Sequence, residues 1–213
     1  MLEKMDVFFE NRIDGYDEHM LTEIEGASEF YPFTAEHLPD GKLLDLGCGT
    51  GLELEFYFKL YSDAHAVGVD LSAKMLERLK EKFPDKNLTL IQGSYFDIQL
   101  KENSYNAAVS VESLHHFTKQ EKIPLYKKLC TYLKADGYFI LTDYFAPDDN
   151  YESFYRSELS RMKSEQGISD DEFYHYDTPL TVKHETEALI AGGFSRVEIL
   201  KNWGLTFTLK AYK

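Results

Sequence analysis

The chain has 213 residues, of which 43% are hydrophobic and 15% aromatic, and its 37 acidic against 23 basic side chains give a formal net charge of −14. This length and composition suit a single α/β domain with one substantial core. A strong negative charge repels polyanions, so we expect a small-molecule partner rather than RNA or DNA, although the charge can also serve solubility alone.

Several features exclude other classes of protein. No stretch approaches the roughly 18 consecutive apolar residues of a membrane span, and the acidic start at residues 1–6 lacks the basic and apolar regions of a signal peptide. Cys48 and Cys130 are the only cysteines, so we expect reduced thiols and no disulfide framework. We therefore expect a cytoplasmic protein that does not bind a membrane. The sequence leaves the oligomeric state open, with a homodimer among the options.

Residues 5–37 precede the first expected strand and are rich in aromatic side chains. Their apolar residues recur at helical spacing, which predicts a pair of helices. We expect an amino-terminal helical cap (1–37) on a core formed by residues 38–213. The cap either forms a lid over a ligand or simply covers one face of the core.

Residues 42–51, Lys-Leu-Leu-Asp-Leu-Gly-Cys-Gly-Thr-Gly, join an apolar strand to three alternate glycines. Glycine has no Cβ and tolerates positive φ, so such a turn lets the backbone pass close to a ligand. A second apolar run, residues 65–70, ends in Asp70, which is placed to accept two ribose hydroxyls from the neighbouring strand. Together the runs indicate a nucleotide-type site, although a strand-to-helix turn can also use glycine for steric reasons alone.

The spacing of the glycines distinguishes between nucleotides. The dinucleotide fingerprint G-x-G-x-x-G, begun at Gly47, needs glycine where this chain has Leu52, so NAD is the second choice. Residues 44–51 instead resemble the first motif of the class I S-adenosylmethionine-dependent methyltransferases, in which the glycine turn faces the methionine part of the cofactor. In similar enzymes leading helices cover the cofactor and an x-Tyr-Asp element reaches the methionine carboxylate. The resemblance therefore gives this role to the pair Tyr16-Asp17 and favours the lid.

Residues 71–97 extend the resemblance. Ser72 is a suitable N-cap for an amphipathic helix that Pro84 ends. The extended run 88–95, closed by Gly93, is similar to the family's third strand and the turn that borders the adenine ring. Many relatives have Asp directly after that glycine to accept the adenine amino group, whereas this chain has Ser94. Asp97 either substitutes for it or is a solvated loop acid.

Residues 105–117 look like the family's fourth motif, a strand and turn beneath the reactive sulfonium. Glu112, His115 and His116 are therefore the candidate catalytic bases, because the pKa of histidine suits proton transfer at neutral pH. The alternative is that the His-His-Phe turn is packing, since consecutive side chains rarely serve one site together. The seven histidines include no H-x-x-x-H pair and the cysteines are isolated, so we expect no metal site.

The last part of the chain completes the fold. A helix leads into residues 133–143, where Gly137 is expected as a left-handed helix C-cap. The pattern then predicts a polar helix at 151–165, an acidic aromatic loop at 169–177, a helix that ends near Ile190, and a terminal hairpin of runs 195–200 and 205–212. Tyr144, Phe145 and residues 174–176 either line an acceptor pocket at the strands' carboxyl ends or simply pack.

The alternation of strands and helices predicts an α/β, Rossmann-like, doubly wound fold with helices on both faces. The resemblance implies a mostly parallel seven-stranded sheet with an antiparallel terminal strand. It also implies methyl transfer from S-adenosyl-L-methionine to a small-molecule acceptor by in-line displacement, with S-adenosyl-L-homocysteine as product. An NAD-linked oxidoreductase and a non-catalytic S-adenosylmethionine-binding protein are the alternatives. The expected cofactor-binding residues are Tyr16, Asp45, Gly47, Cys48, Gly49, Gly51, Asp70, Leu71, Met75, Gly93, Ser94, Tyr95 and Val111.

Overall fold

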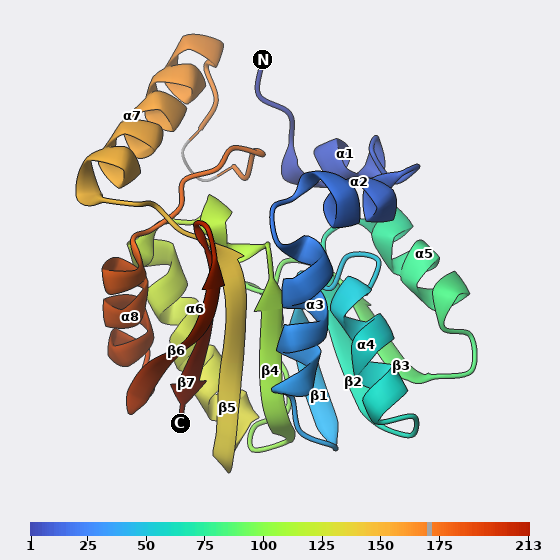
Figure 1. The fold of residues 1–213 in the computed structure, drawn as a ribbon. Helices are drawn as coiled ribbons and strands as arrows, with labels where there is room; N and C mark the ends of the chain where they lie inside the picture. The colour runs from blue at the N-terminus through green and yellow to red at the C-terminus, as the bar shows by residue number, and fades with distance from the viewer. Residues whose placement is uncertain (170–171) are drawn as a thin grey trace.

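The computed structural model describes residues 1–169 and 172–213, and its centre is a seven-stranded sheet with strand order β3-β2-β1-β4-β5-β7-β6 (Figure 1). Five strands run parallel: β1 (Lys42–Leu46), β2 (His65–Asp70), β3 (Asn87–Gln92), β4 (Tyr105–Val111) and β5 (Leu133–Tyr144). Strand β7 (Thr206–Tyr212) lies antiparallel between β5 and β6 (Arg196–Trp203). This confirms the predicted Rossmann-like sheet with a reversed final strand. Positions 170 and 171 of the predicted acidic loop lie outside the described residues.

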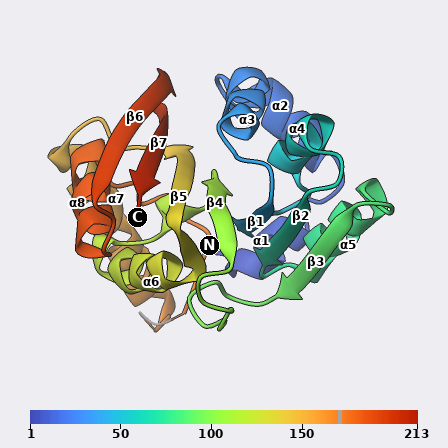
Figure 2. The same cartoon turned by 90° about the horizontal axis from the view of Figure 1, so that it is seen from below.

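Helices cover both faces of the sheet, as the view from below shows (Figure 2). Helices α3 (Ala27–Glu36), α4 (Leu52–Leu60) and α5 (Ala73–Lys82) pack on one face, and α6 (Lys119–Tyr132) and α8 (Val182–Ala191) pack on the other. Alternate strand residues face opposite sides of the sheet. Leu43 and Ile140 belong to the core beneath α3, α4 and α5, and Leu44 and Leu141 belong to the core beneath α6 and α8. Strands β1, β2 and β4 are largely apolar because both of their faces are buried, whereas β3 at the edge of the sheet has no buried residue.

The helix starts follow the capping residues in the sequence. Ser72 Oγ accepts a hydrogen bond from Met75 N–H at 3.2 Å, which confirms the predicted N-cap of α5. Thr181 caps α8 in the same way through His184 N–H. A hydroxyl at this position satisfies one of the free N–H groups at the start of a helix.

The cap contains three helices rather than the predicted pair. Helices α1 (Met5–Glu10) and α2 (Tyr16–Glu23) precede α3. Gly15 and Gly26 interrupt the helical run with φ of 81° and 79°. This left-handed conformation is readily adopted by glycine, and each glycine directly precedes the next helix, Gly15 before α2 and Gly26 before α3.

The prediction for Gly137 is wrong. Helix α6 ends at Tyr132, and Leu133 is already extended, with φ −69° and ψ 145°, as the first residue of β5. No left-handed cap therefore forms at Gly137. The glycine is needed for space instead, because a Cβ there would lie 3.0 Å from the Lys134 carbonyl oxygen and 3.2 Å from the Asn106 carbonyl oxygen.

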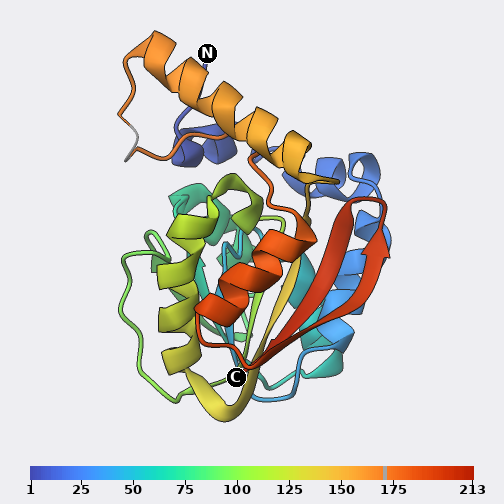
Figure 3. The same ribbon diagram turned by 90° about the vertical axis from the view of Figure 1, so that its left-hand side faces the viewer.

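The carboxyl ends of the parallel strands meet at one edge of the sheet, and several segments lie above it. They are α1, α2, the 3-10 turn η1 (Leu114–His116) and α7 (Asp149–Gln166), which crosses over this edge near the amino terminus (Figure 3). Open parallel sheets bind ligands at this edge. In the described part of the chain, no helix has both the length and the apolar character needed to cross a membrane.

Candidate active site

The turn after β1 contains three glycines with positive φ: Gly47 at 75°, Gly49 at 47° and Gly51 at 73°. Their surroundings differ. A Cβ at Gly47 would lie 2.1 Å from Ser113 Oγ, and a Cβ at Gly51 would lie 2.3 Å from Leu79 Cδ1. A Cβ at Gly49 would meet nothing within 4 Å. Packing therefore requires Gly47 and Gly51, whereas Gly49 borders open space in which a ligand can approach the backbone.

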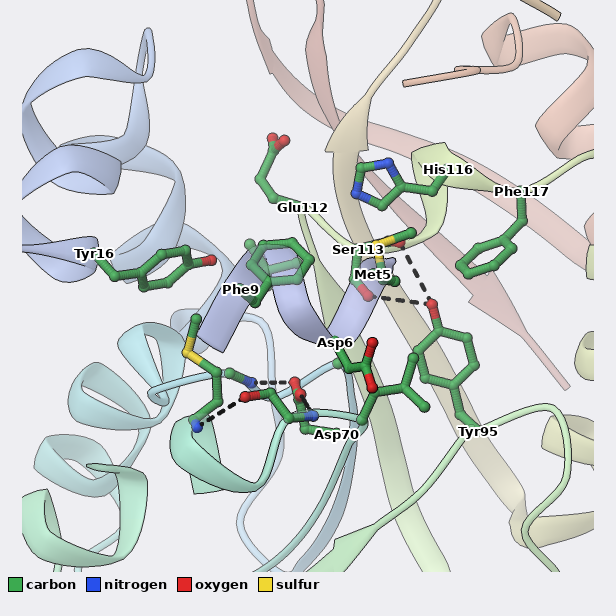
Figure 4. Close-up of a pocket in the computed structure, with 16 residues that line it drawn as sticks. Met5, Asp6, Phe9, Tyr16, Asp70, Tyr95, Glu112, Ser113, His116 and Phe117 are labelled. Atoms are coloured by element: carbon green, nitrogen blue, oxygen red, sulfur yellow. Dashed lines mark hydrogen bonds between the residues drawn. The ribbon is translucent and has the colours of Figure 1, made fainter. Parts of the chain in front are cut away.

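Asp70 ends β2 and faces the same turn. Its Oδ2 accepts a hydrogen bond from Gly49 N–H at 2.9 Å, and its Oδ1 accepts one from Ser72 N–H at 2.8 Å (Figure 4). Burial raises the pKa of Asp70, and these backbone donors oppose the rise. Carboxylate oxygens have additional lone pairs. Asp70 can therefore accept ligand hydroxyls while it holds the glycine turn and the start of α5 in place.

A cavity of about 60 Å³, here called the inner cavity, lies above this turn. Many of the expected cofactor-binding residues line it: Tyr16, Gly47, Gly49, Asp70, Leu71, Met75, Tyr95 and Val111. Helix α1 crosses the cavity and adds Met5, Asp6 and Phe9 to its wall (Figure 4). Ligand pockets usually enclose about 300–1,000 Å³. Helix α1 therefore occupies part of the space that a nucleotide-sized ligand would need.

Asp45 was expected at the cofactor but does not line the inner cavity. Its side chain is buried beneath the glycine turn, and neither of its carboxyl oxygens has a hydrogen-bond partner among the described residues. Burial and the neighbouring carboxyl of Glu53 raise the pKa of Asp45 well above its usual value. Burial likewise raises the pKa of Glu53. The two acids form a buried pair that favours protonation.

Four further expected residues also lie outside the lining of the inner cavity. They are Cys48, Gly51, Gly93 and Ser94. Cys48 is buried against β2, where a Cβ at Gly68 would lie 2.7 Å from its Sγ. Ser94 Oγ accepts the Phe96 N–H at 3.2 Å within its own turn. Asp97, the alternative to Ser94, is exposed on that turn.

A second cavity of about 890 Å³, here called the outer cavity, adjoins the inner one. Phe9, Tyr16, Glu112 and His116 line both cavities and form the junction between them. The rest of the outer wall includes the acids Asp14, Glu23, Glu25 and Asp177, the aromatic residues Phe8, Tyr144 and Trp203, and Arg12. Of the residues expected in an acceptor pocket, Tyr144 and His175 line the outer cavity, whereas Phe145, Tyr174 and Tyr176 do not.

Glu112 stands at the junction with an unusual backbone. Its φ of 48° is uncommon for a residue other than glycine. Its Oε1 accepts a hydrogen bond from Thr206 Oγ1 at 3.2 Å. Burial and the nearby carboxylate of Asp143 raise the pKa of Glu112 to about 8. Strained backbone and a perturbed pKa both concentrate at functional sites, which marks Glu112 as a candidate.

His115 is held between two aspartates. Its Nδ1 lies 2.5 Å from Asp143 Oδ1, and its Nε2 lies 3.4 Å from Asp177 Oδ1. Asp143 is fixed in turn because its Oδ2 accepts the Leu114 N–H at 2.9 Å. Burial alone would lower the pKa of His115, but the two carboxylates raise it well above its usual value.

His116 contacts the same aspartate. Its Nδ1 lies 3.3 Å from Asp177 Oδ1 and 3.3 Å from the Tyr176 carbonyl oxygen. Burial and the adjacent His115 lower the pKa of His116. Asp177 therefore reaches both rings from the segment that follows α7.

The cap is tied to that segment across the mouth of the cavities. Met5 N–H donates to the Phe173 carbonyl oxygen at 3.2 Å, and His175 N–H donates to the Glu3 carbonyl oxygen at 2.9 Å. The rings of Phe8 and His175 stack with centroids 3.4 Å apart. Residues 3–9 and 173–175 therefore form one wall, which borders both cavities.

The two residues of the Tyr16-Asp17 element make different contacts. Tyr16 lines both cavities. Asp17 instead accepts hydrogen bonds from Thr50 Oγ1 and from Lys82 Nζ, the latter at 2.6 Å. Asp17 thus links α2 to the glycine turn and to α5.

Sequence reasoning missed the aspartates that organise the histidines. Asp143 carried one usable signal, since it stands near the carboxyl end of β5, where ligand groups gather. Asp177 carried none, because its contact with η1 depends on how the segment after α7 folds back.

Comparison with known proteins identifies the family. Residues 43–137 match the model of the methyltransferase domain. The chain is 26% identical over 140 residues to the uncharacterized methyltransferase YcgJ of Bacillus subtilis, covering 64% of this chain and 54% of that protein. It is 24% identical over 162 residues to phosphoethanolamine N-methyltransferase of Plasmodium falciparum, covering 74% of this chain and 55% of that protein. The chain thus spans about half the length of these relatives.

The fold agrees with this match. A solved structure from Thermotoga maritima, described as a possible histamine N-methyltransferase, is similar with a TM-score of 0.68 at 20% identity, covering 98% of this chain and 99% of that one. The matched domain, the methyltransferase relatives and the fold together support a class I S-adenosylmethionine-dependent methyltransferase, and S-adenosylmethionine is the cofactor of that family. These comparisons do not support the NAD-linked or the non-catalytic alternative.

Proposed function

We propose that this chain transfers a methyl group from S-adenosylmethionine to a small molecule that carries an amine or cationic group. The observation that carries the proposal is the acidic outer cavity, which opens onto the inner cavity through Phe9, Tyr16, Glu112 and His116. An acceptor in the outer cavity would therefore meet the cofactor at this junction.

Two features of the inner cavity fit the cofactor. Gly49 leaves open space beside its backbone, and Asp70 retains lone pairs for the two ribose hydroxyls. When bound, S-adenosylmethionine supplies a methyl carbon made electrophilic by the positive sulphur. Because α1 narrows the cavity, cofactor entry requires α1 to move, which gives the cap the role of a lid. Such a lid excludes water from the reacting groups.

We assign the acceptor's ammonium group to Glu112. This carboxyl stands at the junction, is buried, and is fixed by Thr206. A carboxylate there holds the nitrogen at the junction and takes its proton, which frees the lone pair that attacks the methyl carbon. His115 and His116 hold Asp177 beside it on the wall of the outer cavity. Orientation of two reactants in this way can lower a barrier by several kcal/mol, up to about 7–11 in the best cases.

The composition of the outer wall supports a cationic acceptor. Asp14, Glu23 and Glu25 add negative charge. The aromatic side chains of Tyr16, Tyr144 and Trp203 also line the outer cavity, and aromatic rings can stabilise a cation. Two of the similar proteins are named for methylation of an amine nitrogen, which agrees with this charge. The net charge of −14 disfavours a nucleic-acid acceptor.

A screen with labelled donor tests the proposal. The purified chain is incubated with labelled S-adenosylmethionine and a panel of small amines, matched alcohols and thiols, and RNA. We expect label in amines, and we expect Glu112→Gln to reduce turnover strongly while binding of S-adenosylhomocysteine is retained. Transfer only to alcohols, thiols or RNA would refute the amine acceptor. Failure of S-adenosylhomocysteine to raise the melting temperature would refute methyl transfer altogether.

A further inference from the structure

Three ligand-type atoms converge on the wall of the outer cavity. They are His115 Nε2, His116 Nδ1 and Asp177 Oδ1, here called the His–Asp cluster, and each residue offers an atom within 4.8 Å of the others. Two of the three separations are 3.4 Å, from His115 Nε2 to Asp177 Oδ1, and 3.3 Å, from His116 Nδ1 to Asp177 Oδ1.

These separations are longer than a typical direct hydrogen bond and also suit two ligands of one metal ion; His116 Nδ1 lies equally close, at 3.3 Å, to the Tyr176 carbonyl oxygen. An N–H···O hydrogen bond normally spans about 2.7–3.2 Å between heavy atoms. In a tetrahedral zinc site with bonds of about 2.0–2.1 Å, neighbouring ligand atoms lie about 3.3–3.4 Å apart. The two measured distances equal the edges of such a tetrahedron.

The surroundings of His115 also resemble those of a metal-bound histidine. Its Nδ1 lies 2.5 Å from Asp143 Oδ1, and Asp143 Oδ2 is fixed by the Leu114 N–H at 2.9 Å. With a proton on Nδ1, the lone pair of Nε2 is left to point at the cluster. Metal-bound histidines typically donate their other ring N–H to a carboxylate in this way.

Charge at the cluster matches a divalent ion. Asp177 and Asp143 carry two negative charges beside two imidazoles, and the sum balances a doubly charged cation. A buried charge is stable only when it is compensated in this manner. Asp177, whose side chain is 47% exposed, and the two histidines all line the outer cavity, so an ion can enter from it.

We propose that the His–Asp cluster binds one divalent transition metal ion, with zinc as the best fit, through His115 Nε2, His116 Nδ1 and Asp177 Oδ1. Imidazole and carboxylate ligands suit this class of ion. Three protein ligands leave a fourth position open towards the outer cavity. That position takes water or an oxygen atom of the acceptor, several ångströms from the Glu112 carboxyl that receives the amine.

Binding of a metal through His115 Nε2 requires that nitrogen to be unprotonated, so metal affinity should fall as the pH is lowered. The expectation from sequence that the chain binds no metal rested on ligand spacing along the chain. It did not include Asp177, which comes from a separate segment and completes the set.

Metal titration tests this proposal without cofactor or acceptor, so the result does not depend on methyl transfer. The full chain is stripped with a chelator, dialysed, and titrated with zinc chloride by calorimetry and with cobalt chloride by visible absorption. We expect one ion per chain, micromolar or tighter affinity, and the intense visible bands of four-coordinate cobalt. Asp177→Asn and His116→Ala should each weaken binding by about 10- to 100-fold or more.

His184→Ala is the matched control, because His184 also faces two carboxylates, Glu152 at 2.8 Å and Asp149 at 3.9 Å, outside the cluster. It should leave the affinity unchanged, and circular dichroism should show that all three variants are folded. The proposal is overturned if the unchanged chain takes up no zinc at tens of micromolar. It is also overturned if folded Asp177→Asn binds zinc as tightly as the unchanged chain.

Discussion

Gly49 and Gly51 share a left-handed backbone conformation, but substitution by alanine should affect them differently. Gly51→Ala should lose more stability, and Gly49→Ala should lose more ligand affinity. Both have positive φ, of 47° and 73°, and an L-residue in the left-handed region costs about 1–2 kcal/mol. At Gly49 a new Cβ meets nothing within 4 Å, so this strain is the whole expected loss of stability for Gly49→Ala. At Gly51 the Cβ would lie 2.3 Å from Leu79 Cδ1, and overpacking of this kind adds about 1–3 kcal/mol. Gly51→Ala should therefore lose about 2–5 kcal/mol in total.

The two substitutions should affect ligand affinity in the reverse order, with the larger loss in Gly49→Ala. The methyl group of Gly49→Ala projects into the inner cavity, where the cofactor needs close approach to the backbone, and should raise the Kd of S-adenosylhomocysteine at least about tenfold, equal to about 1.4 kcal/mol. Gly51→Ala, where folded, should bind within a few-fold of the unchanged chain. Urea unfolding and isothermal calorimetry measure the two effects. Equal losses of stability in the two variants, or unchanged affinity in Gly49→Ala, would show that the surroundings of these glycines have been wrongly assigned.

Three other substitutions test separate parts of the structure. Asp70→Ala should raise the Kd of S-adenosylhomocysteine by about 10- to 100-fold through lost hydrogen bonds to a carboxylate, measured by calorimetry; an unchanged Kd would exclude ribose contact. Glu53→Gln should stabilise the chain, and more so at high pH. Burial raises the pKa of Glu53 in the folded chain, beside Asp45. The contribution of Glu53 to folding stability is therefore complete below the unfolded pKa of 4.5 and is lost as pH rises through the folded pKa, whereas glutamine does not ionise. Urea unfolding at about pH 5 and pH 8 tests this sign. Lys122 Nζ lies 2.5 Å from Glu185 Oε2, and both side chains are buried. Lys122→Met leaves the Glu185 carboxylate buried without its cation and should lower stability by about 3–5 kcal/mol. A loss below about 1 kcal/mol would contradict this account of the pair.

Local pattern was sufficient to predict the strands and the glycine turn, and the resemblance to a known family supplied the seven-stranded order with a reversed final strand. Strand β1 is an apolar run, and the positive φ of Gly47, Gly49 and Gly51 follows from glycine at alternate positions. The junction between α6 and β5 was not predictable in this way. There the chain becomes extended directly at Leu133, so a glycine that looks like a helix cap serves close packing instead.

The organisation of the candidate site depends on contacts that a local pattern does not contain. Glu112, His115 and His116 could be placed near the chemistry because they follow β4. Their pKa shifts depend on Asp143 and Asp177, which reach them from other elements. Asp177 is positioned because residues 173–175 dock against residues 3–5 and because Thr178 N–H donates to the His115 carbonyl oxygen at 3.0 Å. Burial of Asp45 against Glu53 is likewise a product of packing between β1 and α4.

The position of α1 implies that the two cavities do not bind ligands independently. In the proposed function α1 moves to admit the cofactor to the narrow inner cavity, and Phe9 on α1 also lines the outer cavity. Such a movement would separate the stacked rings of Phe8 and His175, and His175 also lies against His116. Cofactor binding would then change the shape offered to the acceptor. Because coupling between two binding equilibria is reciprocal, a bound acceptor must change the affinity for the cofactor by the same factor.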